Sequence, residues 1–520
     1  MPEDDAATGT EFPQPALAAR EGPPRRGPFD RFRIASWQRE ELRTTLWLVP
    51  TILVVGSIGL FAITYALDVA AYNHHLTYPF LIRTPSADAA RQILIAIAAA
   101  VITVVGVVFS ITILALTLAS QQFGPRMMRN FVRDVGNQVT LGVWVATFVY
   151  SVLALGSIST SSGPLGDFVP HLSVAVAEAL LFLDVAVLIY FIHHIAKSIQ
   201  LPEVIAGIAR DLFAAVDAEF PVKAGPGSQG AVPEPTDVRR VAQVLDSGGV
   251  TMPALASGYL QFVAFSQLVQ IAEDAGAVIR LAHRPGHFII AGRPLGTIWP
   301  PKAAPKVEQE LAHAHVTGPH RTLIQDPVFA IDQLVEIAIR ALSAAVNDTF
   351  TALTCIDWLS AGLSVISGRV LSEGVYRDRT GEIRLIELAP SYERMVNRAF
   401  DKIRQAGGAM PAVVIRMLDA LSHIAEHTAH ATQRTVLQRQ AEMIVRRAEE
   451  ADFEPNDLAD VSGRYQDFLA LIDQVSASGD GGLAGPLTAV GVEGDAGGAG
   501  ASTRGGGPVD TLAGPLPGAR

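Results

Sequence analysis

Long apolar stretches are concentrated in the first 200 residues of the chain. A hydrocarbon core about 30 Å thick is crossed by a helix of about 20 apolar residues, each rising about 1.5 Å along the axis. Four stretches reach this length, at residues 44–67, 92–119, 138–158 and 172–195. The pattern therefore predicts an α-helical integral membrane protein, with four transmembrane helices in a membrane block at residues 44–200.

After residue 200 the pattern changes to that of a globular region. Residues 201–220 have the spacing of an amphipathic helix, and a Gly/Pro-rich run at 224–235 is typical of a linker. We expect a mixed α/β, mainly helical cytosolic domain at 201–475, with a small β-module at about 250–301 and a helical part at about 322–475. The candidate elements are strands at 278–281, 288–291 and 296–299 and helices at 391–405, 411–430 and 433–450.

The two ends of the chain show neither pattern. Residues 1–43 form a polar, cytosolic N-terminal segment in which arginines and aromatic residues alternate at 29–37. Such a mixture is typical of an interfacial flank on an anionic leaflet, and the alternative is a flank that only orients the first span. Residues 477–520 are rich in Gly and Ala without periodicity, so we expect this tail to be disordered.

The arginines indicate an orientation for the membrane block. Seven arginines precede the first span, two lie between the first and second spans, three follow the second span, and none lies between the third and fourth. Because cytoplasmic loops retain positive charge, both termini are predicted to be cytoplasmic. Abundant Ala and Arg with only five lysines indicate a GC-rich bacterial genome. The expected location is therefore the bacterial plasma (inner) membrane, crossed several times.

Composition excludes several classes of function. The formal net charge of −11 argues against a nucleic-acid binder, which needs a basic surface. Cys355 is the only cysteine, so neither an internal disulfide nor a multi-cysteine metal site is possible. His423, His427 and His430 have the spacing of one helix face, but no fourth ligand accompanies them, so we favour an ordinary polar face. No catalytic motif is found, and we expect no enzymatic activity, cofactor or metal.

Polar residues also lie within the predicted spans. Thr103, Ser110 and Thr117 recur every seven residues along the second span, so they share one helix face. This stripe either lines a pore or packs against another helix, with the hydroxyls bonded to their own backbone. Asp184 lies near the middle of the fourth span, where a carboxyl group costs at least about 2.5 kcal/mol. We expect it to be protonated, hydrogen-bonded to groups such as Tyr150 or Ser151, or exposed to a hydrated cavity.

Two longer strings of residues carry a family resemblance. The first runs from Phe109 to Tyr150 and contains Ala-Ser-Gln-Gln-Phe-Gly-Pro-Arg at 119–126, and the second runs from Arg321 to Ser343, followed by Val-Asn-Asp at 346–348. The chain resembles the bacterial predicted membrane proteins grouped as domain of unknown function 2254 over about residues 30–475. The resemblance implies the membrane topology and no established activity. In the first string, the candidate residues of a cytosolic-loop motif are Ser120, Gln121, Gln122, Pro125, Arg126, Arg129 and Asp134.

The second string predicts a helix with a polar stripe. Asp332, Glu336 and Arg340 are spaced four residues apart, beside apolar positions with helical spacing. The stripe is either a solvated ladder of ion pairs or part of a polar site. Asp348 or Thr349 also suits the cap of a following helix. The members of the alternative site that flank this helix are Arg321, Gln325, Asp326, Asn347 and Asp348.

The resemblance also shows departures from the family pattern. Ala344 and Thr349 stand where prolines are expected, which loosens the turn after Ser343.

Two functional hypotheses remain. One is an oligomeric channel or transporter subunit gated by its cytosolic domain. The alternative is a membrane-anchored sensor, scaffold or regulatory protein. The expected partners are the lipid bilayer, further copies of the chain and an unidentified small molecule or ion, and nucleic acid is not expected.

Overall fold

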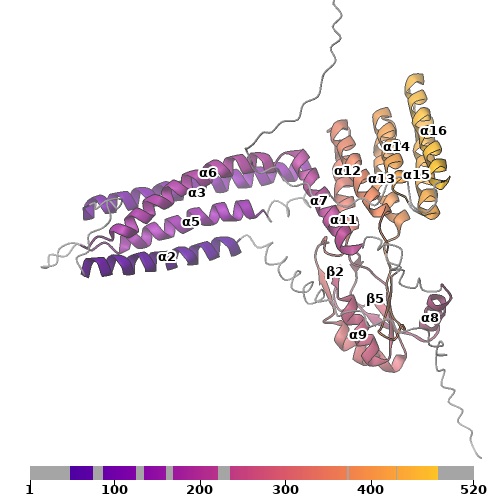
Figure 1. Ribbon diagram of the computed structural model, residues 1–520, viewed down its shortest axis with the longest axis horizontal. Coiled ribbons are helices and arrows are strands. Elements are labelled where there is room, and N and C mark those ends of the chain that lie inside the picture. Colours follow the sequence, from indigo (N-terminus) through magenta and orange to yellow (C-terminus); the bar gives the residue numbers. More distant parts are fainter. Residues whose placement is uncertain are drawn as a thin grey trace, which may run out of the picture.

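The computed structural model describes residues 47–73, 86–123, 134–159, 168–220, 235–371, 374–428 and 430–477. Within these residues the chain is mainly helical and contains two small sheets. Four long helices form an elongated block, and the remaining helices and the strands gather beyond one end of it (Figure 1). The predicted N-terminal segment at 1–43 and nearly all of the predicted linker and tail lie outside the described residues.

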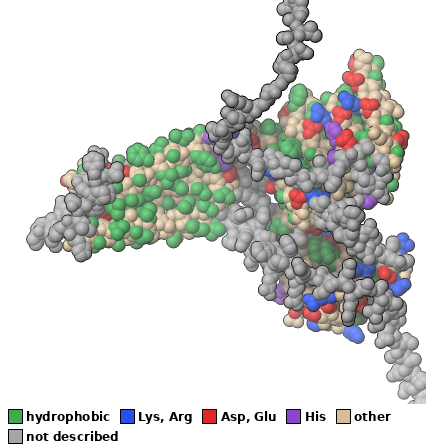
Figure 2. Space-filling view, viewed as in Figure 1, with side chains coloured by type: hydrophobic (Ala, Val, Ile, Leu, Met, Phe, Trp, Pro, Cys, Tyr) green, Lys and Arg blue, Asp and Glu red, His purple; other side chains and the backbone are tan. Residues whose placement is uncertain are grey.

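The elongated block contains helices at all four predicted spans. α5 and α6 each pack against the other three helices, and α5 does so more extensively with α2 and α3. Large apolar side chains on the outside, such as Ile52 and Phe182, are exposed. Hydrophobic side chains extend along the visible face of the block (Figure 2), and a surface of this kind is not typical of a water-soluble monomer. The four helices are α2 (Leu48–Asn73), α3 (Ala87–Phe123), α5 (Val135–Gly156) and α6 (His171–Ser198).

The described residues contain five helices that are long and apolar enough to cross a membrane, one more than the sequence predicted. The fifth is α12 (Thr349–Ser367), which begins a few residues after the polar stripe of the second motif. More than half of its apolar stretch, 56%, is buried inside the chain, a larger share than in any of the other four. Its apolar side chains pack among those of neighbouring helices. Hydrophobicity alone therefore gives five candidate membrane spans, whereas burial distinguishes α12 from the other four.

The helices around α12 share one large hydrophobic core. Leu359 of α12, Leu334 of α11, Phe400 of α13 and Met417 of α14 are among its fully buried side chains. Proline in the first turn starts both α11 and α14, where the missing N–H has no helical partner to lose. The other helices of this core are α7 (Leu201–Glu219), α11 (Pro327–Ala341), α13 (Tyr392–Gly407), α14 (Pro411–Glu426), α15 (Ala431–Glu449) and α16 (Pro455–Ala477).

The histidine pattern near residue 427 does not form one helix face. α14 ends at Glu426, so His427 occupies its C-cap, and His430 is the N-cap of α15. The predicted helix at 411–430 is therefore too long, and the expected common face is wrong because a helix boundary falls inside the pattern. No group of three or more potential metal ligands occurs among the described residues.

Two small sheets form a second hydrophobic core together with short helices. The five-stranded sheet has the order β1-β5-β3-β8-β7, and the three-stranded sheet has the order β4-β2-β6. The predicted strand at 278–281 is β3, that at 296–299 lies within β5, and that at 288–291 shortens to β4. The strands are β1 (Val250–Pro253), β2 (Gly258–Val263), β3 (Val278–Leu281), β4 (Phe288–Ile289), β5 (Pro294–Trp299), β6 (His315–Gly318), β7 (Val375–Arg377) and β8 (Ile383–Ile386); the helices are α8 (Pro235–Gly248), α9 (Phe265–Ala275), η1 (Pro301–Ala303) and α10 (Ala304–Leu311).

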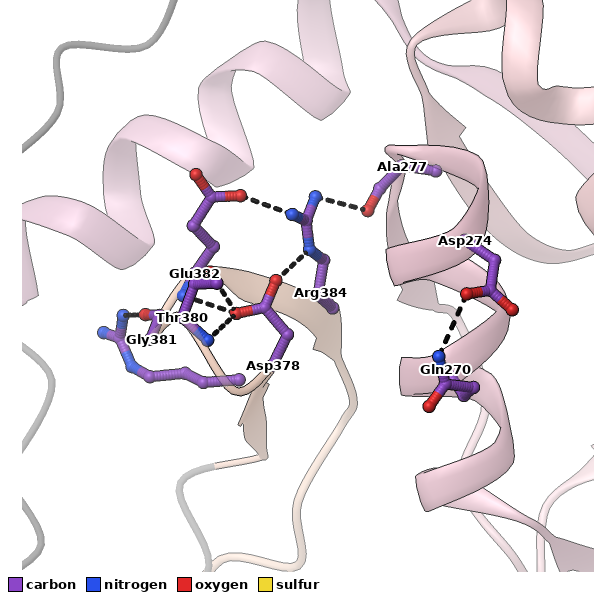
Figure 3. A network of polar contacts seen from close by, with 9 residues as sticks. Gln270, Asp274, Ala277, Asp378, Thr380, Gly381, Glu382 and Arg384 are labelled. Atoms are coloured by element: carbon purple, nitrogen blue, oxygen red, sulfur yellow. Dashed lines mark hydrogen bonds and ion pairs between the residues drawn. The ribbon is translucent and has the colours of Figure 1, made fainter. Parts of the chain in front are cut away.

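The β7–β8 hairpin comes from a later part of the chain, and polar contacts fix it to the first sheet. β8 pairs with β3 in parallel, so residues about 100 positions apart become neighbours. Asp378 accepts hydrogen bonds from Thr380 and Arg384, and Arg384 in turn donates to the carbonyl of Ala277 (Figure 3). Burial opposes the charge on Asp378, but these hydrogen bonds hold its pKa below the usual value.

Candidate functional site

The hydroxyl stripe of α3 lies on the outside of the four-helix block. The side chains of Thr103, Ser110 and Thr117 are exposed. Each hydroxyl donates to the backbone carbonyl four residues earlier, at 2.7–2.9 Å. A single copy of the chain therefore satisfies these hydroxyls within α3, and it does not bring the stripe together with Asp184.

Asp184 lies inside the block, with only 4% of its surface exposed. The Thr147 hydroxyl donates to its Oδ1 at 3.1 Å, and the indole of Trp144 donates to its backbone carbonyl at 3.3 Å. The sequence suggested Tyr150 or Ser151 as partners. Tyr150 instead bonds the Thr64 hydroxyl of α2 at 2.8 Å, and Thr147 of α5 is the side chain that reaches Asp184.

A second buried carboxylate, Asp68, was missed in the sequence because it lies one residue beyond the first predicted span. Its two oxygens accept hydrogen bonds from the backbone N–H groups of Leu172 and Ser173, at 2.8 and 2.9 Å, and from the Ser173 hydroxyl at 2.7 Å. α6 has Pro170 at its N-cap and no local side-chain cap. Asp68 of α2 therefore caps the first turn of α6 from a distance.

The cytosolic-loop motif is described only in part. Pro125, Arg126 and Arg129 lie outside the described residues, as do the side chains of Ser120, Gln121 and Gln122. Asp134 caps α5 by accepting from the Gly136 N–H at 2.9 Å, and it contacts Nε2 of His194 in α6 at 2.5 Å. A Cβ at Gly136 would lie 2.7 Å from the same His194 nitrogen. Asp134 therefore helps to hold α5 and α6 together at this end of the block.

The second motif supplies one wall of a pocket between the three-stranded sheet and helices α11 and α13. Arg321 forms ion pairs with Asp326 at 2.6 Å and with Asp332 at 2.5 Å. Arg398 of α13 forms a second ion pair with Asp332. Asp326 and Asp332 are both strongly shielded from solvent, so the two carboxylates hold the two guanidinium groups in fixed positions.

The pocket has a volume of about 1110 Å³, which is ample for a small organic ligand. Five cationic side chains line it and only three carboxylates, although the whole chain carries net negative charge. The charged lining residues are Arg284, Arg321, Arg394, Arg398, Lys402, Asp326, Asp332 and Glu336, and the other lining residues include His283, His287, His320, Tyr259, Phe288 and Phe329.

Arg284 is the buried cation of this pocket, and His287 is its hydrogen-bond partner. Arg284 is 7% exposed, and its Nε donates to His287 Nε2 at 3.1 Å. Burial and then the positive charge of Arg284 lower the pKa of His287 to about 4. His287 is therefore neutral at pH 7 and accepts a hydrogen bond from Arg284 without neutralising it. Among the described residues, no carboxylate forms an ion pair with Arg284.

The turn that carries Arg284 and His287 rests on Asp326. Gly286 has a φ of +89°, a backbone conformation that favours glycine. A Cβ at this position would overlap the Asp326 carboxylate. The turn at 283–288 therefore approaches the start of α11 as closely as it does because residue 286 has no side chain.

Other members of the predicted polar site serve the fold. The amide of Gln325 bonds both the N–H and the carbonyl of Val263 in β2, at 2.8 and 3.0 Å. Asp348 caps α12 by accepting from the Thr351 N–H at 3.1 Å. Arg340 and Asn347 do not line the pocket. The structure thus brings Arg321, Asp326, Asp332 and Glu336 together in the pocket lining, which does not include Gln325, Arg340, Asn347 and Asp348.

Several pocket residues were not selected in the sequence. Arg394, Arg398 and Lys402 are spaced four apart on α13 and form a basic stripe beside the acidic positions of α11. This spacing was the available signal. Arg284 and His287 lie in a turn more than 100 residues before α13, and nothing in the local sequence indicates that contact.

Comparison with known proteins gives a family but no activity. The family model described as "Predicted membrane protein (DUF2254)" matches residues 43–423. An uncharacterized protein of Mycobacterium bovis is 33% identical over 430 residues, which cover 81% of this chain and 80% of that protein. Two uncharacterized proteins of Mycobacterium tuberculosis, from strains H37Rv and CDC 1551, match with the same identity and coverage. No solved structure matches the chain.

Proposed function

We propose that this chain, which belongs to the DUF2254 family of predicted membrane proteins, acts as a membrane-anchored sensor in the bacterial inner membrane. In this proposal α2, α3, α5 and α6 cross the bilayer and both termini lie in the cytoplasm. Residues 201–475 form the cytosolic domain, and the pocket between the three-stranded sheet and helices α11 and α13 binds a small solute there.

The surface of the four-helix block supports its placement in the bilayer. Its exposed side chains are largely apolar. Its helices also satisfy their backbone polar groups internally, as segments that cross hydrocarbon must. Asp68, Asp134 and Asp184 all have hydrogen-bond partners on neighbouring helices, so these three carboxylates do not need to face lipid. α12 has similar apolarity but packs within the large core, and we place it in the cytosolic domain.

The pocket is the observation that carries the proposal for a sensor. It holds more positive than negative side chains, and its walls come from two different hydrophobic cores. A ligand that bridges Arg284 on the turn and Arg394 on α13 would contact both parts at once. Binding energy at such a junction favours one relative arrangement of the two parts over others, which is how a solute signal is transmitted through a fold.

A channel formed by several copies is the second candidate function. The outward hydroxyl stripe of Thr103, Ser110 and Thr117 favours it, because helices in a membrane associate through small and hydroxyl-bearing residues. In a ring of copies this stripe would face a partner or a central path. Ion flux through liposomes that contain the purified oligomer supports the channel, whereas a monomer that passes no ions leaves only the sensor.

Hydrogen exchange tests the sensor proposal without assuming a particular ligand. The full chain in lipid nanodiscs is compared with and without a protein-free extract of cytoplasmic small molecules. The expected result is slower exchange at residues 283–288 and 392–407, reversed by dialysis, with α16 unchanged as the internal control. If no extract fraction slows exchange at the pocket, the proposal is wrong.

A further inference from the structure

We infer that the pocket between the 283–288 turn and α13 binds a phosphorylated small molecule of about nucleotide size. This inference rests on the proposed function and specifies its ligand. It follows from three features of the lining: uncompensated cations, two arginines held rigidly by carboxylates, and aromatic side chains at the edge of the charged surface.

The uncompensated cations are Arg284, Arg394 and Lys402. Within the described parts of the chain, none of them forms an ion pair with a carboxylate, although all three line the same pocket. Burial lowers the pKa of Arg284; the negative charge of Asp326 opposes this effect, and the positive charge of Arg394 adds to it. Arg284 is buried, whereas Arg394 and Lys402 are exposed to solvent at the pocket. A buried charge that lacks an ion pair is costly, and like charges at close range repel one another. An anion in the pocket would stabilise the buried charge of Arg284 and reduce the repulsion among the cations.

The carboxylates of the pocket support its arginines and do not cancel its charge. Asp326 and Asp332 are occupied by Arg321 and Arg398, through four N–H groups at 2.5–2.9 Å. Each guanidinium is planar and offers five donors, so N–H groups remain for a ligand after these bonds form. Planar, oriented guanidinium groups suit the oxygens of a phosphate, which accept several hydrogen bonds at once.

Phosphate matches the number of cations better than a single carboxylate does. A phosphomonoester carries about 1.5 to 2 negative charges at pH 7 and three strong acceptor oxygens. Arg284, Arg394 and Lys402 together supply three positive charges, none of which forms an ion pair with a carboxylate of the described residues. A diphosphate would engage all of them, while His287, which is neutral at pH 7, would gain a proton as negative charge approaches.

The size and edge of the pocket indicate more than inorganic phosphate. Tyr259 and Phe288 lie edge to face at the rim, with ring centroids 5.1 Å apart, and Phe288 is half exposed. An exposed aromatic ring beside a cationic pocket provides a surface on which a planar base can stack. The volume of about 1110 Å³ leaves space for a base and sugar beyond the phosphates.

Titration calorimetry on the full chain in phosphatidylcholine nanodiscs tests this inference, with ADP and inorganic pyrophosphate as probes. We expect each probe to bind at one site per chain and ADP to bind more tightly. Arg394→Gln, on the exposed side of α13, should weaken both by roughly tenfold or more, because it removes a charge-assisted contact. Arg284→Gln should do the same. Arg416→Gln is the matched control, since Arg416 pairs with Asp357 on another surface, and it should bind as the wild type.

A second arm separates a soluble ligand from a lipid headgroup. Nanodiscs that also contain phosphatidylglycerol should bind ADP unchanged if the ligand is soluble. If phosphatidylglycerol displaces ADP, the same phosphate chemistry is served by a headgroup and the inference stands with a lipid source. If neither probe binds, or if Arg394→Gln binds both probes as the wild type does, the inference is wrong. Extract-induced protection without phosphate binding would overturn this inference alone, and failure of both experiments would overturn the proposed function as well.

Discussion

Arg284 and His287 show how a neutral histidine can hold a buried guanidinium that forms no ion pair with a carboxylate of the described residues. The buried guanidinium donates to a histidine that is neutral at pH 7, because burial and the cations around it lower the pKa of His287 to about 4. The arginines involved are Arg284 first, then Arg394 and Arg321. This arrangement makes the stability of the pocket depend on pH in a defined direction.

Acidification should destabilise the wild-type chain more than His287→Gln. Between pH 6.5 and about pH 4 the unfolded histidine binds a proton while the folded one does not, so His287 lowers the free energy of unfolding as pH falls through this window. Above pH 6.5 it is neutral in both states and contributes nothing. The melting temperatures of both proteins in nanodiscs at pH 7 and pH 5 provide the measurement. An equal decrease in melting temperature in the two proteins would show that the pKa of His287 is not lowered in the folded chain.

Gly286→Ala should destabilise the chain by about 1–3 kcal/mol, through its positive φ and through overlap with Asp326. Gly381→Ala is the matched control, because Gly381 has nearly the same φ, +88°, with open space around its Cα. The difference between the two variants therefore measures the close approach of the turn to Asp326. Equal melting temperatures for the two variants would contradict that close approach.

The sequence predicted four of the eight charged residues that line the pocket. Arg321, Asp326, Asp332 and Glu336 were candidates because they follow one another closely in a motif and share one helix or its flank. Arg284 and Arg394 belong to other segments, and their approach depends on how the turn at 283–288 packs against α13. Periodicity reports which residues share a face of one element, but not which second element that face meets.

At the scale of elements, α12 illustrates both a successful and an incomplete prediction. The sequence suggested that Asp348 or Thr349 caps a helix at this position, and Asp348 does so through the Thr351 N–H and hydroxyl. α12 was not among the spans predicted from the sequence, although it is long and apolar enough to cross a membrane. Conversely, the helix expected at 411–430 ends at Glu426, because a turn separates α14 from α15.

Asp348→Ala should lower the free energy of unfolding by about 1 kcal/mol, the usual contribution of an N-cap side chain. Asp348→Asn should retain most of the stability, because an amide oxygen also accepts from the Thr351 N–H. Hydrogen exchange at the first turn of α12, together with the melting temperature, distinguishes this local effect from a global one. Exchange that is unchanged in Asp348→Ala would show that the cap is not needed.

The whole molecule combines an apolar four-helix block with a second part that contains two large hydrophobic cores. The hydrophobic pattern predicted the block well, because each long helix coincides with a long apolar stretch. The junction that forms the pocket could not be predicted in the same way. β7 and β8 lie between α12 and α13 in the chain but pair with β3, so the two cores are interleaved in sequence. The local pattern of apolar and polar residues cannot indicate that a late hairpin pairs with a much earlier strand.

One labelling measurement tests whether a ligand-binding pocket faces the cytoplasm. His320 is exposed and lines the pocket, so His320→Cys in a Cys355→Ser background places a single thiol there. The native Cys355 is fully buried, and burial raises its pKa to about 12, so the native thiol is already unreactive. Gly156→Cys, on the exposed end of α5 that the proposal places outside the cell, is the control.

The reagent is a maleimide that does not cross membranes. We expect Gly156→Cys to react in intact cells and His320→Cys to react only in inverted membrane vesicles, where the small-molecule extract should slow the reaction of His320→Cys. Labelling of His320→Cys in intact cells, or a rate in vesicles that no extract changes, would contradict the proposal of a cytoplasmic sensor.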